Sequence, residues 1–318
     1  MRRSVTMPMI ALGGLAVLVV PTPAAADYPH QVVTLVTHSS PGGGSDVFLR
    51  ELVRHLGPKM GVTFVVENVS GGSGARAMSR LAVAPADGSV FYATTPTYIY
   101  TSLLSSPEHS FRDLQPLVNV FYDPEVVYTR ADGPLQTLED AMEAARERRG
   151  RWGAANPASL ERQVLEQLKE AAGVEPAIVS HEGGGALILN VLNGTLDIGV
   201  GEIQELRSQL DAGQVRLLAV FSGERLEDYP DLPTVQESGY DVVVRKFRGL
   251  AGPKGLPADV IAAWEEAIPA VLADPAYEQV YEAESLIPAF MPQAEYQQFI
   301  DSFAAETETF LKESGVVN

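Results

Sequence analysis

Two glycine-rich segments in the first third of the chain could bind an anion through their backbone N–H groups. They are Pro41–Asp46 (PGGGSD) and Ser70–Gly74 (SGGSG), and each joins an apolar, β-branched stretch to a stretch with helical apolar spacing. Glycine lets the backbone approach a ligand closely. The helix that follows adds unpaired N–H groups and the positive end of its dipole. The pattern predicts an anion site; a turn capped by Ser45 or Asp46 without a ligand is the alternative.

The second half of the chain has two further segments of this kind, Gly153–Ser159 (GAANPAS) and His181–Gly185 (HEGGG). We expect them to face the first pair across a cleft. His181 is interpreted as a polar group of the cleft wall, and a histidine on the surface is the alternative. Arg248 suits a bidentate bond to a carboxylate, and a structural ion pair is an equal alternative.

The elements that must position these segments alternate between strands and helices. Strands are predicted at Val32–Thr37, Thr63–Glu67 and Val90–Thr94, and the helix after the first strand is predicted to end at Gly57-Pro58. The same alternation continues to Phe221, which predicts parallel sheets flanked by helices. The glycine-rich segments then lie at the carboxyl ends of strands, where open α/β sheets bind their ligands.

The strand and helix pattern divides the chain into two α/β lobes. We expect the chain to cross between them near Tyr122–Tyr128 and to return near Asp241–Phe247, which places a hinge under a cleft. The first lobe is predicted to comprise residues 27–125 and 246–318, and the second residues 126–245. After the last predicted strand of the second lobe, Arg225–Gly239 is predicted to be a loop. Helices are predicted near the C-terminus, over Ala258–Leu272, Pro275–Ala283 and Gln293–Glu313.

The N-terminal residues are typical of a signal peptide. Arg2 and Arg3 precede the apolar run Met9–Val20, and Ala24–Ala26 is a small-residue cleavage pattern. The alternative, a membrane anchor, needs roughly 20 apolar residues, which is more than this run supplies. Residues 1–26 are therefore predicted to be removed near Ala26, and the mature protein is expected in the periplasm.

Composition excludes several classes of function. The chain has 23 basic and 41 acidic residues, a formal net charge of -18, which argues against a nucleic-acid partner. It has no cysteine, so thiol chemistry and lipid attachment at a cysteine are excluded. The histidine spacing fits no metal site, and no G-x-S-x-G or H-E-x-x-H motif occurs. Asp197 and Glu202 are interpreted as a strand-end cap and an acid of the cleft or surface. We expect neither enzyme activity nor a metal.

Five motifs together resemble the receptors of tripartite tricarboxylate transporters, the TctC or Bug family. They are Pro41–Asp46, Glu67–Ala75 (ENVSGGSGA), Pro85–Gly88 (PADG), Arg216–Val220 (RLLAV) and Asp231–Gly239 (DLPTVQESG). The resemblance implies a two-lobed, type II-like periplasmic binding protein, or Venus flytrap, without a cofactor. We expect a monomer. The resemblance also implies a small mono-, di- or tricarboxylate ligand that is delivered to a membrane permease.

The same resemblance implies a set of ligand-binding residues, to which Arg248 is added. The first lobe contributes Ser40, Gly43, Ser45, Asp46, Ser70, Gly72 and Thr95, and the second lobe contributes Ser159, His181, Gly184 and Gly185. The sequence departs from the family pattern at His181-Glu182, where an aromatic residue is more common, and at Phe247, where many members have Trp. Two other functions stay open at this point, a flytrap that signals to a sensor protein and an exported hydrolase.

Overall fold

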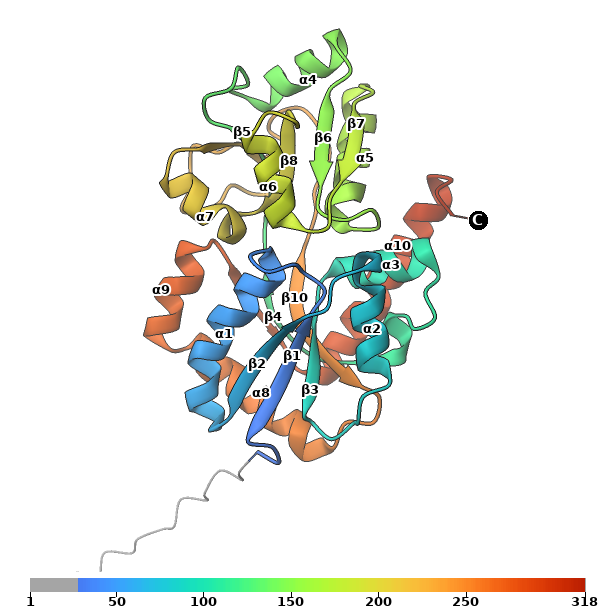
Figure 1. Ribbon diagram of the computed structural model, residues 1–318, viewed down its shortest axis with the longest axis vertical. Helices are drawn as coiled ribbons and strands as arrows, with labels where there is room; N and C mark the ends of the chain where they lie inside the picture. The colour runs from blue at the N-terminus through green and yellow to red at the C-terminus, as the bar shows by residue number, and fades with distance from the viewer. Residues whose placement is uncertain (1–27, 318) are drawn as a thin grey trace, which may run out of the picture.

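The computed structural model describes residues 28–317 as two α/β lobes stacked one above the other (Figure 1). The predicted signal peptide and its cleavage point lie outside the described residues. Each lobe has one mixed sheet with helices against it, which confirms the two-lobed α/β fold. No described helix combines the length and the apolar character that crossing a membrane requires.

The sheet of the first lobe has six strands in the order β11-β4-β10-β3-β1-β2. Strand β1 pairs in parallel with β2 and β3, whereas β10 and β11 run antiparallel to their neighbours. The strands are β1 (Val32–Thr37), β2 (Thr63–Asn68), β3 (Val90–Thr94), β4 (Leu114–Tyr122), β10 (Phe247–Pro253) and β11 (Ile287–Met291). The helices of this lobe are α1 (Gly44–Met60), α2 (Ala75–Ala82), α3 (Pro96–Ser105), α8 (Ala258–Leu272), α9 (Pro275–Ala283) and α10 (Gln293–Glu313).

The sheet of the second lobe has five strands in the order β7-β6-β8-β5-β9. Its strands are β5 (Glu125–Arg130), β6 (Arg151–Ala154), β7 (Ala177–Ser180), β8 (Ile198–Glu202) and β9 (Val215–Val220). Its helices are α4 (Leu138–Glu147), α5 (Leu160–Ala172), α6 (Gly184–Leu192) and α7 (Ile203–Asp211). Because β5 is antiparallel to both neighbours, this sheet is also mixed, and the prediction of wholly parallel sheets was wrong.

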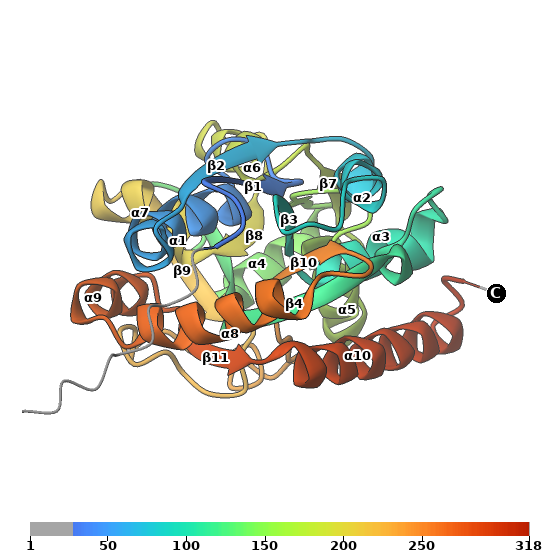
Figure 2. The ribbon, with the colours of Figure 1, turned by 90° about the horizontal axis from the view of Figure 1, so that it is seen from below.

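Two short crossings join the sheets. Asp123 and Pro124 connect β4 to β5, and the segment after β9 returns through Lys246 to β10. A third connection is noncovalent, because Tyr100 of α3 and Leu311 of α10 belong to the apolar cluster of the second lobe. Figure 2, which views the molecule from below, shows α10 running along one edge of the molecule toward the C-terminus. The exact lobe boundaries predicted from the sequence remain a proposal.

Helix α1 shows where a local rule failed. The helix does not end at Gly57-Pro58 but continues to Met60 and closes on Gly61, whose φ of 64° is left-handed. Proline removes one N–H and crowds the preceding turn. Pro58 lies in the last turn of α1, and only two helical residues follow it. The helix therefore tolerates the proline at this position. The Gly61 N–H donates to the Gly57 carbonyl and closes the end.

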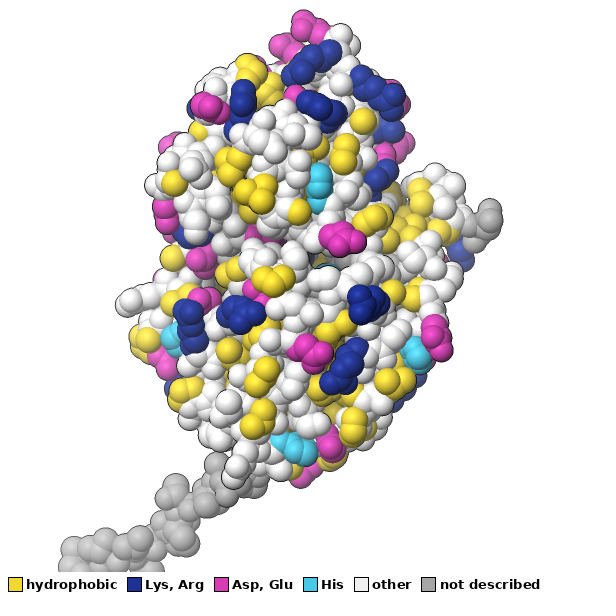
Figure 3. Space-filling view, in the orientation of Figure 1, with side chains coloured by type: hydrophobic (Ala, Val, Ile, Leu, Met, Phe, Trp, Pro, Cys, Tyr) yellow, Lys and Arg dark blue, Asp and Glu magenta, His cyan; other side chains and the backbone are white. Residues whose placement is uncertain are grey.

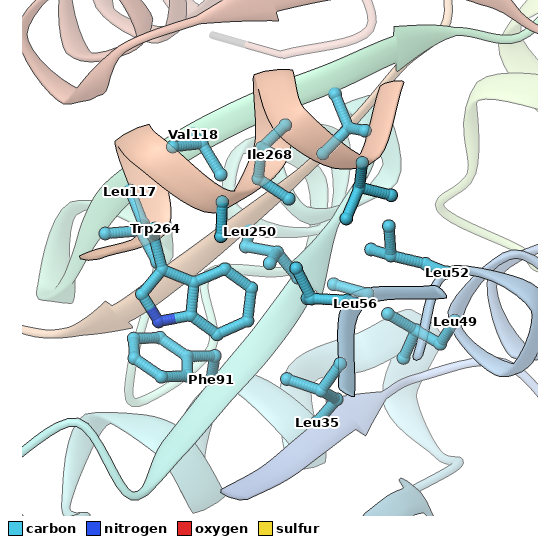
Figure 4. Close-up of a cluster of buried hydrophobic side chains, with 14 of the residues drawn as sticks. Leu35, Leu49, Leu52, Leu56, Phe91, Leu117, Val118, Leu250, Trp264 and Ile268 are labelled. Atoms are coloured by element: carbon cyan, nitrogen blue, oxygen red, sulfur yellow. The ribbon is translucent and has the colours of Figure 1, made fainter. Parts of the chain in front are cut away.

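The largest apolar cluster of the first lobe lies between its sheet and helices α1 and α8 (Figure 4). Trp264 is fully buried at its centre, with ring centroids 4.9 Å from Phe91 and 5.7 Å from Phe64. Its indole N–H donates to the Tyr28 hydroxyl at 3.1 Å. This cluster fixes α1 against the sheet, and therefore fixes the glycine-rich loop at the start of α1.

Replacing Trp264 with alanine should lower the free energy of unfolding by about 3–5 kcal/mol, because it removes a fully buried aromatic side chain and leaves a cavity. Urea denaturation followed by circular dichroism measures the loss. Val83→Ala is the control, since Val83 is 72% exposed and its change should stay within about 0.5 kcal/mol. A loss below about 1 kcal/mol for Trp264→Ala would contradict the central position of this side chain.

Candidate functional site

Figure 1 shows the start of α1 facing α6 and α7 of the second lobe. Residues of these elements line a small cavity between the lobes. Its volume is about 30 Å³, room for little more than a water molecule, so the lobes are closed on each other. Figure 3 shows acidic side chains along the line where the lobes meet. The lining comprises His38, Ser39, Gly44, Ser45, Thr95 and Thr97 from the first lobe, Ala155, Asn156, Glu161, Gly183, Gly184, Glu202 and Glu205 from the second, and Lys246 from the return crossing.

The first wall is the glycine-rich loop between β1 and α1. Gly42 has a φ of 80°, and Gly43 is an extended N-cap without a side-chain hydrogen bond. The Gly44 N–H donates across the cleft to Glu205 Oε2 at 3.0 Å. A Cβ on Gly44 would lie 2.5 Å from Arg248 Nη2 and 2.6 Å from Glu202 Oε2. The loop therefore needs glycine at this position because charged side chains approach its backbone.

Asp46 holds this loop in shape. Its Oδ2 accepts from the Gly42 N–H at 2.9 Å, and its Oδ1 accepts from Asn68 Nδ2 at 2.9 Å. Arg50 forms an ion pair with it at 2.8 Å. Burial opposes ionisation, but the hydrogen bonds from Arg50, Gly42 and Asn68 outweigh it and hold the pKa of Asp46 below its ordinary value. The carboxylate positions the loop through these bonds.

The second wall is the start of α6 together with α5 and α7. Gly183 has a φ of 114°, and a Cβ there would lie 2.4 Å from Ser40 Oγ of the first lobe. A Cβ on Gly184 would lie 2.1 Å from Glu205 Oε2. Both glycines are required because the two lobes and the Glu205 carboxylate meet at this point.

Hydrogen bonds between neutral groups also join the two lobes. The Ala158 N–H donates to Ser73 Oγ at 3.2 Å, and the Ala158 carbonyl accepts from Thr101 Oγ1 at 3.2 Å. The Leu160 N–H donates to Thr97 Oγ1 at 3.4 Å. These bonds join the start of α5 to the first lobe, so the closed arrangement is stabilised by the chain's own groups.

Lys246 lies at the centre of a buried ion network in the crossings. Its Nζ is 2.7 Å from Glu125 Oε1 and 2.8 Å from Glu161 Oε1, and it also bonds Glu202. The oxygens of these three carboxylates lie within 4.8 Å of one another, close enough to share a cation. The ammonium group of Lys246 lies among them and supplies that positive charge.

Arg248 extends the network toward the glycine-rich loop. It pairs with Asp123 of the first crossing, and its Nη1 donates to Ser45 Oγ at 3.0 Å. Its Nη2 forms an ion pair with Glu202 Oε1 at 3.0 Å, but the geometry is not that of a hydrogen bond. Nη2 has no hydrogen-bond partner among residues 28–317. The Nη2 group therefore retains unused hydrogen-bond donors beside the Gly44 backbone.

Burial shifts the pKa values of the cleft acids in opposite directions. Desolvation raises the pKa of Glu205 and of Glu125 to about 8. Glu161 is equally buried, but attraction to Lys246 outweighs desolvation and lowers its pKa to about 2. Burial also lowers the pKa of His38 to about 4, so this imidazole, which bonds the Tyr92 hydroxyl, is neutral near pH 7.

The structure brings part of the predicted site together. Ser45, Thr95 and Gly184 line the cavity. Ser40 contacts Gly183, while the remaining residues of the two facing loops, Gly43 and Gly185, adjoin the lining. Arg248 has the predicted proximity to the loop and also the alternative ion pair with Asp123. The ligand-binding role of these residues stays a prediction.

Other predicted residues lie beside the cavity rather than in its lining. Ser159 caps α5, its Oγ accepting from the Arg162 N–H at 3.1 Å. The Ser70 carbonyl accepts from Arg76, and Gly72 belongs to a 3-10 turn before α2. The His181 N–H donates to the Ala154 carbonyl, which places this residue at the end of the β6–β7 pair.

Sequence reasoning missed the charged part of the site. Lys246, Asp123, Glu125, Glu161 and Glu205 were not predicted, although Glu202 was considered for the cleft. A partial signal exists, because Glu161 and Glu205 lie in the first turns of helices that begin at the carboxyl ends of strands. Their partners are 85 and 161 residues away, which no local pattern reveals.

Comparison with known proteins agrees with this geometry. A family model described as "Tripartite tricarboxylate transporter family receptor" matches residues 48–316. The chain is 25% identical to Protein BugT of Bordetella pertussis over 314 residues, 96% of this chain and 95% of BugT. The structure of the periplasmic binding protein BugD covers 91% of this chain and 99% of its own, with a TM-score of 0.83 and 25% identity.

The R. palustris protein Rpa4515, solved with adipate, matches with a TM-score of 0.86 and 25% identity, covering 91% of this chain and 99% of that one. The matches extend over both lobes and both crossings. The chain therefore belongs to the tripartite tricarboxylate transporter receptors, a family of substrate-binding proteins.

Proposed function

We propose that this protein is an exported receptor that captures a small carboxylate between its lobes and delivers it to a membrane permease of the same transport system. In this proposal residues 1–26 are removed near Ala26 and the mature protein acts in the periplasm. Family membership supports the transport role. The structure of Rpa4515 with adipate, over a similar fold, supports a carboxylate ligand.

One contact is the main support for a carboxylate on the ligand. The Gly44 N–H at the start of α1 donates to a carboxylate oxygen, that of Glu205, at 3.0 Å. A helix N-terminus of this kind favours negative charge. The Nη2 group of Arg248, which has no hydrogen-bond partner among residues 28–317, lies beside it. When the lobes open, Glu205 leaves with the second lobe, and a ligand carboxylate can accept hydrogen bonds from Gly44 and Arg248 in its place.

Closure then follows from differential binding. The open form binds the carboxylate on the first lobe. Contacts of the ligand with α5, α6 and α7 then add to the hydrogen bonds that the lobes make with each other, and so shift the equilibrium toward the closed form. The two crossings, at Asp123-Pro124 and Lys246, are the segments about which the lobes rotate. The permease would recognise the surface that closure creates.

A carboxylate that binds should raise the melting temperature of the mature protein by several degrees, because binding to the native state alone stabilises it by about 2.7 kcal/mol at 100 times Kd. Differential scanning fluorimetry with mono-, di- and tricarboxylates, adipate among them, is the measurement. If no acid shifts the melting temperature at millimolar concentration, the proposed function is wrong.

Gly44→Ala should abolish that shift, because its Cβ would enter the space beside Arg248 and Glu202. Circular dichroism should first establish that this variant folds, because the added Cβ must displace the buried Arg248 and Glu202 side chains. Gly223→Ala is the matched control, because Gly223 is exposed and nothing lies within 4 Å of its Cβ position. A full shift in Gly44→Ala would place the carboxylate elsewhere.

A further inference from the structure

The cleft contains more acidic than basic groups. Five acids, Asp123, Glu125, Glu161, Glu202 and Glu205, adjoin two bases, Lys246 and Arg248, and burial raises the pKa of two of these acids, Glu125 and Glu205, to about 8. All are buried. A second carboxylate on the ligand would add to this excess in a region of low dielectric, where an unpaired charge costs most.

The bases offer little to a second carboxylate. Lys246 is bonded to three carboxylates, and the Nη2 group of Arg248 is assigned to the first carboxylate of the ligand. His38 is neutral, and its Nδ1 is bonded to Tyr92. Within residues 28–317, the lining therefore has no cation left to pair with a second acid group.

Acceptors, in contrast, remain unpaired. Glu161 lines the cavity, is 6% exposed, and its Oε2 has no hydrogen-bond partner among the described residues. The Thr95 hydroxyl lines the cavity on the first lobe and is likewise unpaired there. Glu205 has one protein donor, Gly44, which the ligand carboxylate would take. The Thr95 hydroxyl can donate or accept, but a buried carboxyl oxygen without a donor is costly, so Glu161 and Glu205 call for a ligand that brings donors.

We infer, on the basis of the proposed function, that the ligand carries a protonated amino group close to its carboxylate, and that Glu161 and Glu205 bind this amino group. An ammonium group has three donors and no acceptor. It would satisfy the Glu161 and Glu205 oxygens on the second lobe while the carboxylate binds Gly44 and Arg248 on the first. The zwitterion would then bridge the two lobes.

The test compares ligands of equal chain length in isothermal titration calorimetry. One series is succinate, aspartate and 2-aminobutanoate; the other is adipate, 2-aminoadipate and 2-aminohexanoate, with 1,6-diaminohexane added. An amino-bearing member should bind at least about tenfold more tightly than the diacid of its series, equivalent to roughly 1.4 kcal/mol. In Glu205→Gln, which can still accept from Gly44, this preference should fall below about threefold.

The controls separate the two proposals. Glu143→Gln, an exposed position on α4 of the same lobe, should keep the preference. Tighter binding of the diacids would overturn the amino-group inference and leave the carboxylate receptor intact. If 1,6-diaminohexane binds and none of the acids does, the amino site is supported and the carboxylate proposal is overturned. Binding of no compound would overturn both.

Proton release gives a second readout that needs no variant. Burial, and then repulsion from Glu161, raise the pKa of Glu205 to about 8. Asp123 acts in the same direction, the Gly44 N–H and Arg248 oppose it, and Tyr128 also lies near the carboxyl. Glu205 is therefore protonated at pH 7 in the unliganded protein. An ammonium ligand should ionise it and release up to about one proton per ligand bound.

Titrations at pH 7 in phosphate and in Tris, whose ionisation enthalpies differ, measure this release for the amino acid that binds. The release should vanish in Glu205→Gln and persist in Glu143→Gln. Binding without proton release in the wild-type protein would contradict an ammonium group at Glu205. Retained release in a folded Glu205→Gln protein would assign the proton to another residue.

Discussion

The buried ion network around Lys246 and Arg248 is the constraint on which the closed structure depends. Lys246 lies on the return crossing and Arg248 just after it, at the start of β10, and their acidic partners come from the first crossing and from the second lobe. Burying ions costs several kcal/mol each unless each is paired and hydrogen-bonded. The network therefore fixes where the two crossings lie relative to each other, and the hinge has one well-defined position when the lobes are closed.

This constraint also explains the glycines. Gly44 and Gly184 lie against the side chains of Arg248, Glu202 and Glu205, at distances where any Cβ would overlap. The glycine-rich loops are thus complementary to the charged groups opposite them. Loop and network form one site, with backbone donors on the first lobe and carboxylates on the second.

The sequence predicted the parts of this site that are local. Strand β3 and helices α8, α9 and α10 have the predicted bounds, because their apolar spacing and flanking residues are sufficient to define them. Helix α3 was missed because Pro96–Ser102 are all buried, so it has no polar face to reveal its period. Strand β4 was missed as well; Pro116 interrupts its apolar pattern. The Lys246 network joins residues 44 to 121 positions apart, and only the fold brings them together.

The noncovalent connection through Tyr100 and Leu311 has a mechanical consequence. Helix α10 packs on the first lobe through Tyr296 and Ile300, yet its last turn belongs to the core of the second. Separating the end of α10 from the second lobe would expose apolar surface to water, and the free-energy cost of this step grows with the area exposed. Opening of the cleft therefore requires the end of α10 either to detach from the second lobe or to move together with it.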